Sequence, residues 1–408
     1  MLLLLTSILC NIALSQYDSF IDLRKDTLFN AESGKRWPRS TPIPFRFDFA
    51  IHLPSRQKIR RVLRFIEEKS CVRFVENPRN ANLNVPTVHV INDRTCWSRV
   101  GAHFDSNEQN LSIPFGCTDS FGVVAHEIFH LLGFEHTQTR IDRNNHIKVN
   151  ESNIKPKELS QYEIHEDLPS IVYRFPYEFG SVMHYAAYGN SLDADHPTIL
   201  PKNRDFIRTI GQRLRISFLD LLLLNEFYGC FDPSKCLEIT CKNGGVPNCS
   251  CFCPKGFSGE RCDDVEPASS KNPNCSTVLE ADSHWKAHKV ELDSGVRNNG
   301  ENLFQPEECW VHLEAPLGHQ IEVRFVEFSG KCDHICSLNG VELKTRDFEM
   351  TGLRDCCAEL LLSKTFTSSK ERFVIGAFAR NNATIFSFQF RSVRREIVDE
   401  VIQLDNQI

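Results

Sequence analysis

The stretch from Ala125 to His136 constrains the fold of this chain more than any other. It reads AHEIFHLLGFEH and contains the pattern H-E-x-x-H-x-x-G-x-x-H. On an α-helix, His126 and His130 stand four residues apart, so both imidazoles project from one face. Gly133 can adopt the left-handed backbone that ends a helix, which lets the chain return His136 to the same point. Three neutral histidines suit one zinc ion and leave a coordination position open for water.

Glu127 directly follows the first of these histidines, where a carboxylate can accept a proton from that water. The alternative is that the histidines are merely packed or solvated on an amphipathic helix, because a bare H-E-x-x-H arises by chance. The longer pattern fixes five residues, including the glycine that the turn needs. We therefore favour the metal site, with one zinc ion per chain and Glu127 as its general base.

The length, charge and cysteine content of the chain limit which classes of partner and which cellular compartment can be expected. A chain of 408 residues is long enough for roughly two to four domains. Its net charge of −6 gives no indication of a nucleic-acid partner or of strong attraction to a membrane. Of 17 cysteines, Cys10 lies in an N-terminal apolar run, and the other 16 favour disulfides in an oxidising compartment.

Residues 1–15 are apolar and end in the small-residue pattern Ala13-Leu14-Ser15. They resemble a signal peptide cleaved before Gln16, and they are too short to favour a membrane anchor. We therefore expect a secreted, extracellular product. Sequons for N-glycosylation are compatible with secretion, and they lie at Asn110, Asn150, Asn248, Asn274 and Asn382.

Hydrophobic spacing predicts the elements around the motif. Apolar residues from Ile59 to Ile66 recur at helical spacing and predict a helix over 55–69, with Ser55 as its N-cap. The β-branched residues over 87–91 predict a strand. We expect the metal helix to begin near Asp119 or Ser120.

A last helix of this region is predicted after Ser217. Ser217 and Asp220 have the spacing of a capping box, and Gly229 marks the end of the helix. The run between them is apolar all round, which predicts a buried helix.

The composition changes after Cys230. Six cysteines fall within residues 236–262, a segment too small to build its own apolar core without disulfides. From 275 to 393 short segments alternate with a period of two, as in Phe386-Ser387-Phe388-Gln389-Phe390. That alternation predicts a β-sandwich.

These residues together resemble the astacin family of zinc endopeptidases. The resemblance rests on the zinc motif and on four further stretches, which are Trp37-Pro38, Arg140–Arg143, Ser181–Tyr185 and Ile210–Arg213. The two later regions resemble EGF-like and CUB domains, an order similar to nematode members of the family. The predicted domains are a signal peptide (1–15), a short propeptide or arm (16–29), an astacin-like metalloprotease domain (30–231), an EGF-like module (232–263), a linker (264–274), a CUB-like domain (275–393) and a tail (394–408).

The resemblance implies a two-lobed α+β metzincin domain with zinc at the floor of a cleft. It assigns Tyr185 as an additional zinc ligand that swings to the reaction oxyanion, and Met183 as a hydrophobic base beneath the metal. The predicted disulfides are Cys71–Cys230, Cys96–Cys117, Cys236–Cys249, Cys241–Cys251, Cys253–Cys262 and Cys275–Cys309. Cys332, Cys336, Cys356 and Cys357 allow three pairings, and the adjacent Cys356 and Cys357 are expected to bond to other cysteines.

Some positions depart from the family pattern. Thr137 follows the third histidine, where relatives have a glutamate that pairs with the mature N-terminus. We therefore expect weak latency and measurable activity before the propeptide is removed. Leu338-Asn339-Gly340 stands where calcium-binding CUB domains place a carboxylate, so no calcium site is expected there.

The predicted function is that of a secreted zinc endopeptidase acting on extracellular or matrix proteins. A catalytically silent adhesion or scaffold protein with the same fold is the alternative from another class, and a digestive enzyme is a third reading. Arg208, Arg213 and Arg215 lie where relatives use basic residues to bind an acidic side chain after the scissile bond. The sequence does not identify the substrate.

Overall fold

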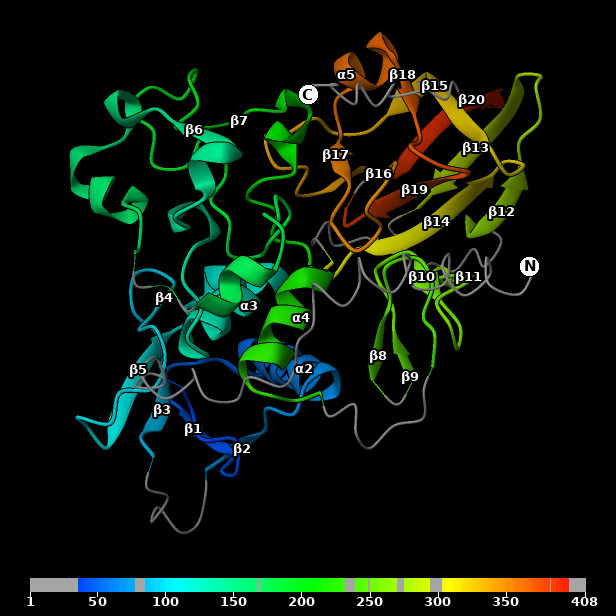
Figure 1. Ribbon diagram of the computed structural model, residues 1–408. Coiled ribbons are helices and arrows are strands. Elements are labelled where there is room, and N and C mark those ends of the chain that lie inside the picture. The colour runs from blue at the N-terminus through cyan, green and yellow to red at the C-terminus, as the bar shows by residue number, and fades with distance from the viewer. Residues whose placement is uncertain are drawn as a thin grey trace, which may run out of the picture.

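The computed structural model describes residues 36–77, 85–166, 168, 170–231, 239–248, 250–269, 275–293, 303–381 and 383–395. These ranges form an α+β region, a small disulfide-rich region and a β-sandwich, which confirms the predicted fold class (Figure 1). Several predictions concern residues outside the described ranges: the signal peptide, the 16–29 segment, the Cys236–Cys249 bond, the sequons at Asn274 and Asn382, and most of the C-terminal tail.

A five-stranded sheet and two helices build the first half of the α+β region. The strand order is β2-β1-β3-β5-β4, and only β4 runs antiparallel to its neighbour. The elements are β1 (Ile43–Phe47), α2 (Leu53–Lys69), β2 (Phe74–Glu76), β3 (Thr87–Ile91), β4 (Trp97–Ser98), β5 (Glu108–Ser112) and α3 (Phe121–Leu131). Apolar residues of both helices and of the sheet form one core, and the predicted strand over 87–91 is confirmed.

The predicted N-cap of α2 is wrong. The helix begins at Leu53 after His52, with a proline in its first turn. Proline is tolerated there because the first N–H groups of a helix have no intrahelical partner. Ser55 is instead buried inside the helix, and its Oγ lies 3.2 Å from Thr118 Oγ1.

The second half of the α+β region contains little regular structure. One strand pair, β6 (Ile147–Val149) with β7 (Ile199–Pro201), stands among short 3₁₀ turns. The region ends in α4 (Phe218–Phe227), where the predicted capping box between Ser217 and Asp220 is confirmed. Disulfides join Cys71 to Cys230 and Cys96 to Cys117.

The disulfide-rich region consists of two short hairpins. They pair β8 (Val246–Asn248) with β9 (Ser250–Phe252) and β10 (Phe257–Ser258) with β11 (Asp264–Val265). The disulfides here are Cys241–Cys251 and Cys253–Cys262.

The sandwich packs a five-stranded sheet, β12-β14-β19-β16-β17, on a four-stranded sheet, β13-β20-β15-β18. Its elements are β12 (Thr277–Glu280), β13 (Lys286–Leu292), β14 (Glu307–Glu314), β15 (His319–Ser329), β16 (Asn339–Lys344), β17 (Leu353–Asp355), α5 (Ala358–Ser363), β18 (Thr365–Thr367), β19 (Arg372–Ala379) and β20 (Thr384–Arg394). Phe386, Phe388 and Phe390 alternate into the core, as the period of two predicts. Disulfides join Cys275 to Cys309, Cys332 to Cys357 and Cys336 to Cys356.

A group of charges, of which Glu308 and Glu342 are buried and Arg215 and Lys255 partly buried, joins all three regions. Arg215 of the α+β region pairs with Glu308 at 2.6 Å and with Glu342 of the sandwich. Lys255 of the disulfide-rich region also reaches Glu308, at 2.7 Å. Removing one partner of such a buried pair leaves an uncompensated charge, which typically costs about 3–5 kcal/mol. The sandwich is therefore held against the α+β region by specific contacts.

Candidate active site

The three motif histidines converge on one point. His126 and His130 lie on α3, and Gly133, with φ of 102°, turns the chain back toward His136. One ring nitrogen of each histidine lies within 4.8 Å of the others. The predicted convergence of these side chains is therefore present.

Backbone carbonyls fix the orientation of two of these rings. His126 Nδ1 donates to Val182 O and His130 Nδ1 donates to Phe134 O, both at 2.8 Å. With the proton on Nδ1, the lone pair of His130 Nε2 faces His136 Nε2 at 3.1 Å. Neutral imidazoles that turn lone pairs toward a common point are the donor set that zinc requires, so these residues fit the ion.

Burial keeps the ligands neutral. Desolvation lowers the pKa of all three motif histidines, to about 4 for His130. The neighbouring guanidinium of Arg213 acts in the same direction. Only the neutral ring can bind a metal through Nε2, so this environment favours metal binding at neutral pH.

Glu127 is 6% exposed at the same site. Burial raises the pKa of its carboxyl group to about 7, and the positive charge of Arg213 opposes that shift. A carboxyl group in this range can both accept and return a proton near neutral pH. This environment therefore suits Glu127 to proton transfer.

The turn around Met183 contacts two of the three histidines, His126 through Val182 and His136 through Tyr185. Asp220 of α4 accepts hydrogen bonds from Ser181 Oγ at 2.6 Å and from Val182 N at 2.7 Å. The carbonyl of Val182 is the acceptor that orients His126. Asp220 therefore connects α4 to a zinc ligand, a role that its capping-box spacing alone does not predict.

Met183 and Tyr185 follow Val182, whose carbonyl orients His126, and their roles as hydrophobic base and additional zinc ligand stay predictions. The side chain of Met183 is 3% exposed. The ring of Tyr185 is half-buried, and its centroid lies 4.3 Å from that of His136. Burial raises the pKa of the Tyr185 hydroxyl to about 12, so it retains its proton and can donate a hydrogen bond.

Thr137 is buried, and its backbone N–H donates to Met183 O at 3.1 Å.

A second carboxyl group, Glu178, is buried beneath the turn around Met183. Glu178 accepts hydrogen bonds from Gly180 N at 2.7 Å and from Thr351 N of the sandwich at 3.1 Å. Burial raises its pKa from 4.5 to about 8, and the charge of Asp220 adds to this effect.

The raised pKa of Glu178 predicts a pH-dependent stability. Between pH 4.5 and about 8 the folded chain retains a proton that the unfolded chain has lost. Stability should therefore fall as the pH rises through this window, and Glu178→Gln should flatten that slope. Thermal midpoints measured from pH 5 to 8 test this, with exposed Glu163→Gln as the control. Equal slopes in wild type and Glu178→Gln would contradict the assignment.

The three arginines considered for an acidic side chain have other contacts. Arg208 lies 3.4 Å from Asp355, and Arg215 pairs with Glu308, so both bind the sandwich. Arg213 is partly buried and donates to His184 O at 3.0 Å. The sequence positions of Arg208 and Arg215 gave no sign of these contacts, because their partners lie in the sandwich.

The sequons within the described ranges differ in exposure. Asn110 lies exposed on β5, whereas Asn150 and Asn248 are partly buried. Glycosylation of all five sites stays a prediction.

The fold and the site together define a zinc metalloendopeptidase, with zinc held by His126, His130 and His136. Residues 29–229 match the Astacin peptidase family, and the chain belongs to this family. Zinc metalloproteinase nas-27 of Caenorhabditis elegans is 34% identical over 374 residues, which cover 89% of this chain and 86% of that protein. Zinc metalloproteinase nas-20 of the same organism is 34% identical over 358 residues, which cover 85% of each.

Among solved structures, the high choriolytic enzyme 1 of Oryzias latipes, a hatching enzyme zinc-protease, is 28% identical to this chain. The match has a TM-score of 0.44 and covers 48% of this chain and 96% of that one. Within the described ranges, every helix is too short or too polar to span a bilayer.

Proposed function

We propose that this chain is a secreted endopeptidase that hydrolyses peptide bonds of extracellular or matrix proteins, with Glu127 as the general base. The observation that carries the proposal is a buried carboxyl group on Glu127, the residue that directly follows His126 of the three-histidine zinc site. All 14 described cysteines are paired in disulfides, which supports an oxidising compartment.

Bound zinc supplies Lewis acidity, which polarises a carbonyl group and makes water a stronger acid. Glu127 accepts the proton of the attacking water and passes it to the nitrogen of the leaving amine. The Tyr185 hydroxyl donates a hydrogen bond to the oxygen that becomes negative in the transition state. Asp220 and the carbonyl of Val182 keep His126 in position throughout.

One assay separates the peptidase from a catalytically silent scaffold. The purified protein should contain one zinc ion per chain and cleave a denatured protein. A zinc chelator should stop cleavage, and added zinc should restore it. A folded, zinc-loaded chain that cleaves no denatured protein would support the scaffold. Cleavage profiling with peptides from extracellular proteins would then identify the preferred sequence.

Tyr185→Phe tests the proposed oxyanion donor. The variant should lose about 10²-fold in kcat, because one preorganised donor to the oxyanion is removed. KM and zinc content should change little, since the aromatic ring still packs on His136. Tyr188→Phe, a half-buried tyrosine that contacts His334, is a matched control. Unchanged kcat in Tyr185→Phe would remove Tyr185 from the mechanism.

A further inference from the structure

The metal helix α3 begins without a side-chain cap of its own. Its N-cap residue is Ser120, whose Oγ donates to Arg213 O and accepts no hydrogen bond from the helix. The first N–H groups of any helix lack intrahelical partners and must be satisfied from outside. In α3, two of these N–H groups belong to Phe121 and Gly122, which precede the first zinc ligand His126 by five and four residues.

The sandwich region supplies the partner for the first of these donors. Phe121 N donates to Phe304 O at 3.1 Å. The ring of Phe304 belongs to the hydrophobic core of the α+β region, and its centroid lies 5.7 Å from that of Phe121. Phe304 stands just before β14, so a residue of the sandwich region closes the start of the metal helix.

The N–H group of Gly122 is satisfied by the segment Arg213–Arg215, which the sandwich also contacts. Gly122 N donates to Arg213 O at 3.0 Å. A Cβ at Gly122 would lie 2.3 Å from that carbonyl, so the approach requires glycine. The next two residues of this segment contact the sandwich. Leu214 packs on its buried cysteines, and Arg215 pairs with Glu308.

The guanidinium group of Arg380 connects the start of α3 to the sandwich region. It donates to Asp119 O, just before α3, at 2.5 Å, and to Leu303 O at 2.6 Å. A third hydrogen bond reaches Ser337 O at 3.2 Å. Arg380 is 5% exposed and follows the end of β19.

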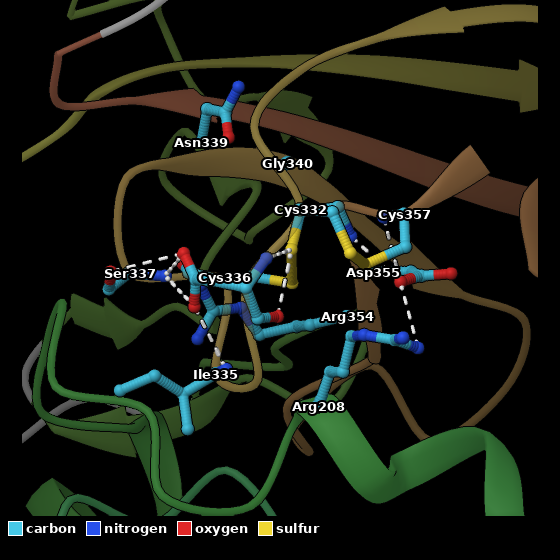
Figure 2. The surroundings of a disulfide bond; sticks show 12 residues. Arg208, Cys332, Ile335, Cys336, Ser337, Asn339, Gly340, Arg354, Asp355 and Cys357 are labelled. Atoms are coloured by element: carbon cyan, nitrogen blue, oxygen red, sulfur yellow. Dashed lines mark hydrogen bonds and ion pairs between the residues drawn. A yellow bond between two sulfur atoms is a disulfide. The ribbon is translucent and has the colours of Figure 1, made fainter.

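Two neighbouring disulfides hold the loop on which Arg380 rests. Cys332–Cys357 and Cys336–Cys356 tie the 332–337 loop to the chain after β17 (Figure 2). The backbone N–H of Arg380 donates to Leu338 O at 2.6 Å, directly after this loop. The disulfides therefore hold two of the acceptors of Arg380, Ser337 O and Leu338 O, and three of the four cysteines pack on Leu214.

We infer that the β-sandwich caps the metal helix, and that Phe304 and Arg380 are positioning residues for the zinc site. The carbonyl of Phe304 accepts the first N–H of α3. Arg380 donates to the carbonyls of Asp119 and of Leu303, the residue before Phe304. The placement of His126 and His130 then depends on the sandwich. The inference requires the zinc site but not the proposed role of Glu127, so zinc retention tests it independently of turnover.

The test compares Arg380→Gln with two controls in the full-length chain. Arg391→Gln removes an arginine that pairs with Glu322 on the four-stranded sheet of the sandwich. Val323→Ala weakens the sandwich core without changing the contacts of Arg380. Zinc release to a chelating dye, kcat and KM, and hydrogen exchange of residues 119–124 are measured for each variant.

Arg380→Gln should release zinc about tenfold faster, as expected when a group that orients metal ligands is removed. Its kcat should fall by a larger factor than its KM changes, and hydrogen exchange of residues 119–124 should become faster. Arg380→Lys should recover part of each loss. Both controls should match the wild type in zinc release. Wild-type zinc release in Arg380→Gln, or equally fast release in Val323→Ala, would overturn the inference. If Arg380→Gln does not fold, Phe304→Ala replaces it under the same criteria; this variant keeps the carbonyl acceptor but removes the ring that packs on Phe121 and holds the acceptor in place.

Discussion

Replacing Glu127 with alanine should lower kcat by about 10²–10⁴-fold, because the attacking water loses its general base. The zinc content should remain one ion per chain, since His126, His130 and His136 keep their partners. Turnover of a protein substrate and metal analysis of the same preparation measure the two effects.

Two further variants make this result specific. Glu127→Gln preserves the shape of the side chain but cannot accept the proton, so it should be as inactive as the alanine variant. Glu68→Ala removes an exposed carboxylate from α2 and should match the wild type. Full activity in Glu127→Ala would end the assignment of Glu127, and loss of zinc would show that this residue supports the ligands instead.

Removing the Cys71–Cys230 disulfide should destabilise the α+β region by about 5 kcal/mol, since a cross-link over a long loop restricts the unfolded chain most. The bond joins residues 159 positions apart, whereas Cys96 and Cys117 are 21 apart. Removal of the shorter link should therefore cost less, about 3 kcal/mol.

Urea unfolding of the Cys71→Ser/Cys230→Ser and Cys96→Ser/Cys117→Ser double variants compares the two disulfides directly. Activity serves as the probe, because it reports the α+β region and not the sandwich alone. The reverse order of stability would mean that native contacts around the two bonds outweigh the restriction of the unfolded chain.

The site was predictable where side-chain type and spacing determine the geometry. His126 and His130 meet because they are four residues apart on a helix, and Gly133 reverses the chain because it can adopt a positive φ. The alternation of Phe386, Phe388 and Phe390 likewise predicted the sandwich, because each turns to the same face. These are local rules, and the sequence carries them directly.

The contacts that orient the site were not predictable in this way. Val182 and Phe134 hold the zinc ligands through backbone carbonyls, which every residue possesses. Nothing in the sequence marks Phe304 as the acceptor for Phe121. Pairing among Cys332, Cys336, Cys356 and Cys357 likewise depends on where loops meet in space. Ser55 was mistaken for a cap because a proline nearby starts the helix earlier.

The hydrogen bond between Phe121 and Phe304 also bears on the timing of biosynthesis. A ribosome makes the chain from its N-terminus at about 5–20 residues per second. Phe304 follows Phe121 by 183 positions, so it leaves the ribosome roughly 10–35 s later. During that interval the newly made motif lacks the acceptor for its first helical N–H. A ribosome that stops before position 304 would thus leave the Phe121 N–H without this acceptor, although the Arg213 acceptor of Gly122 is already made, so the fully capped metal helix forms only after synthesis has passed Phe304.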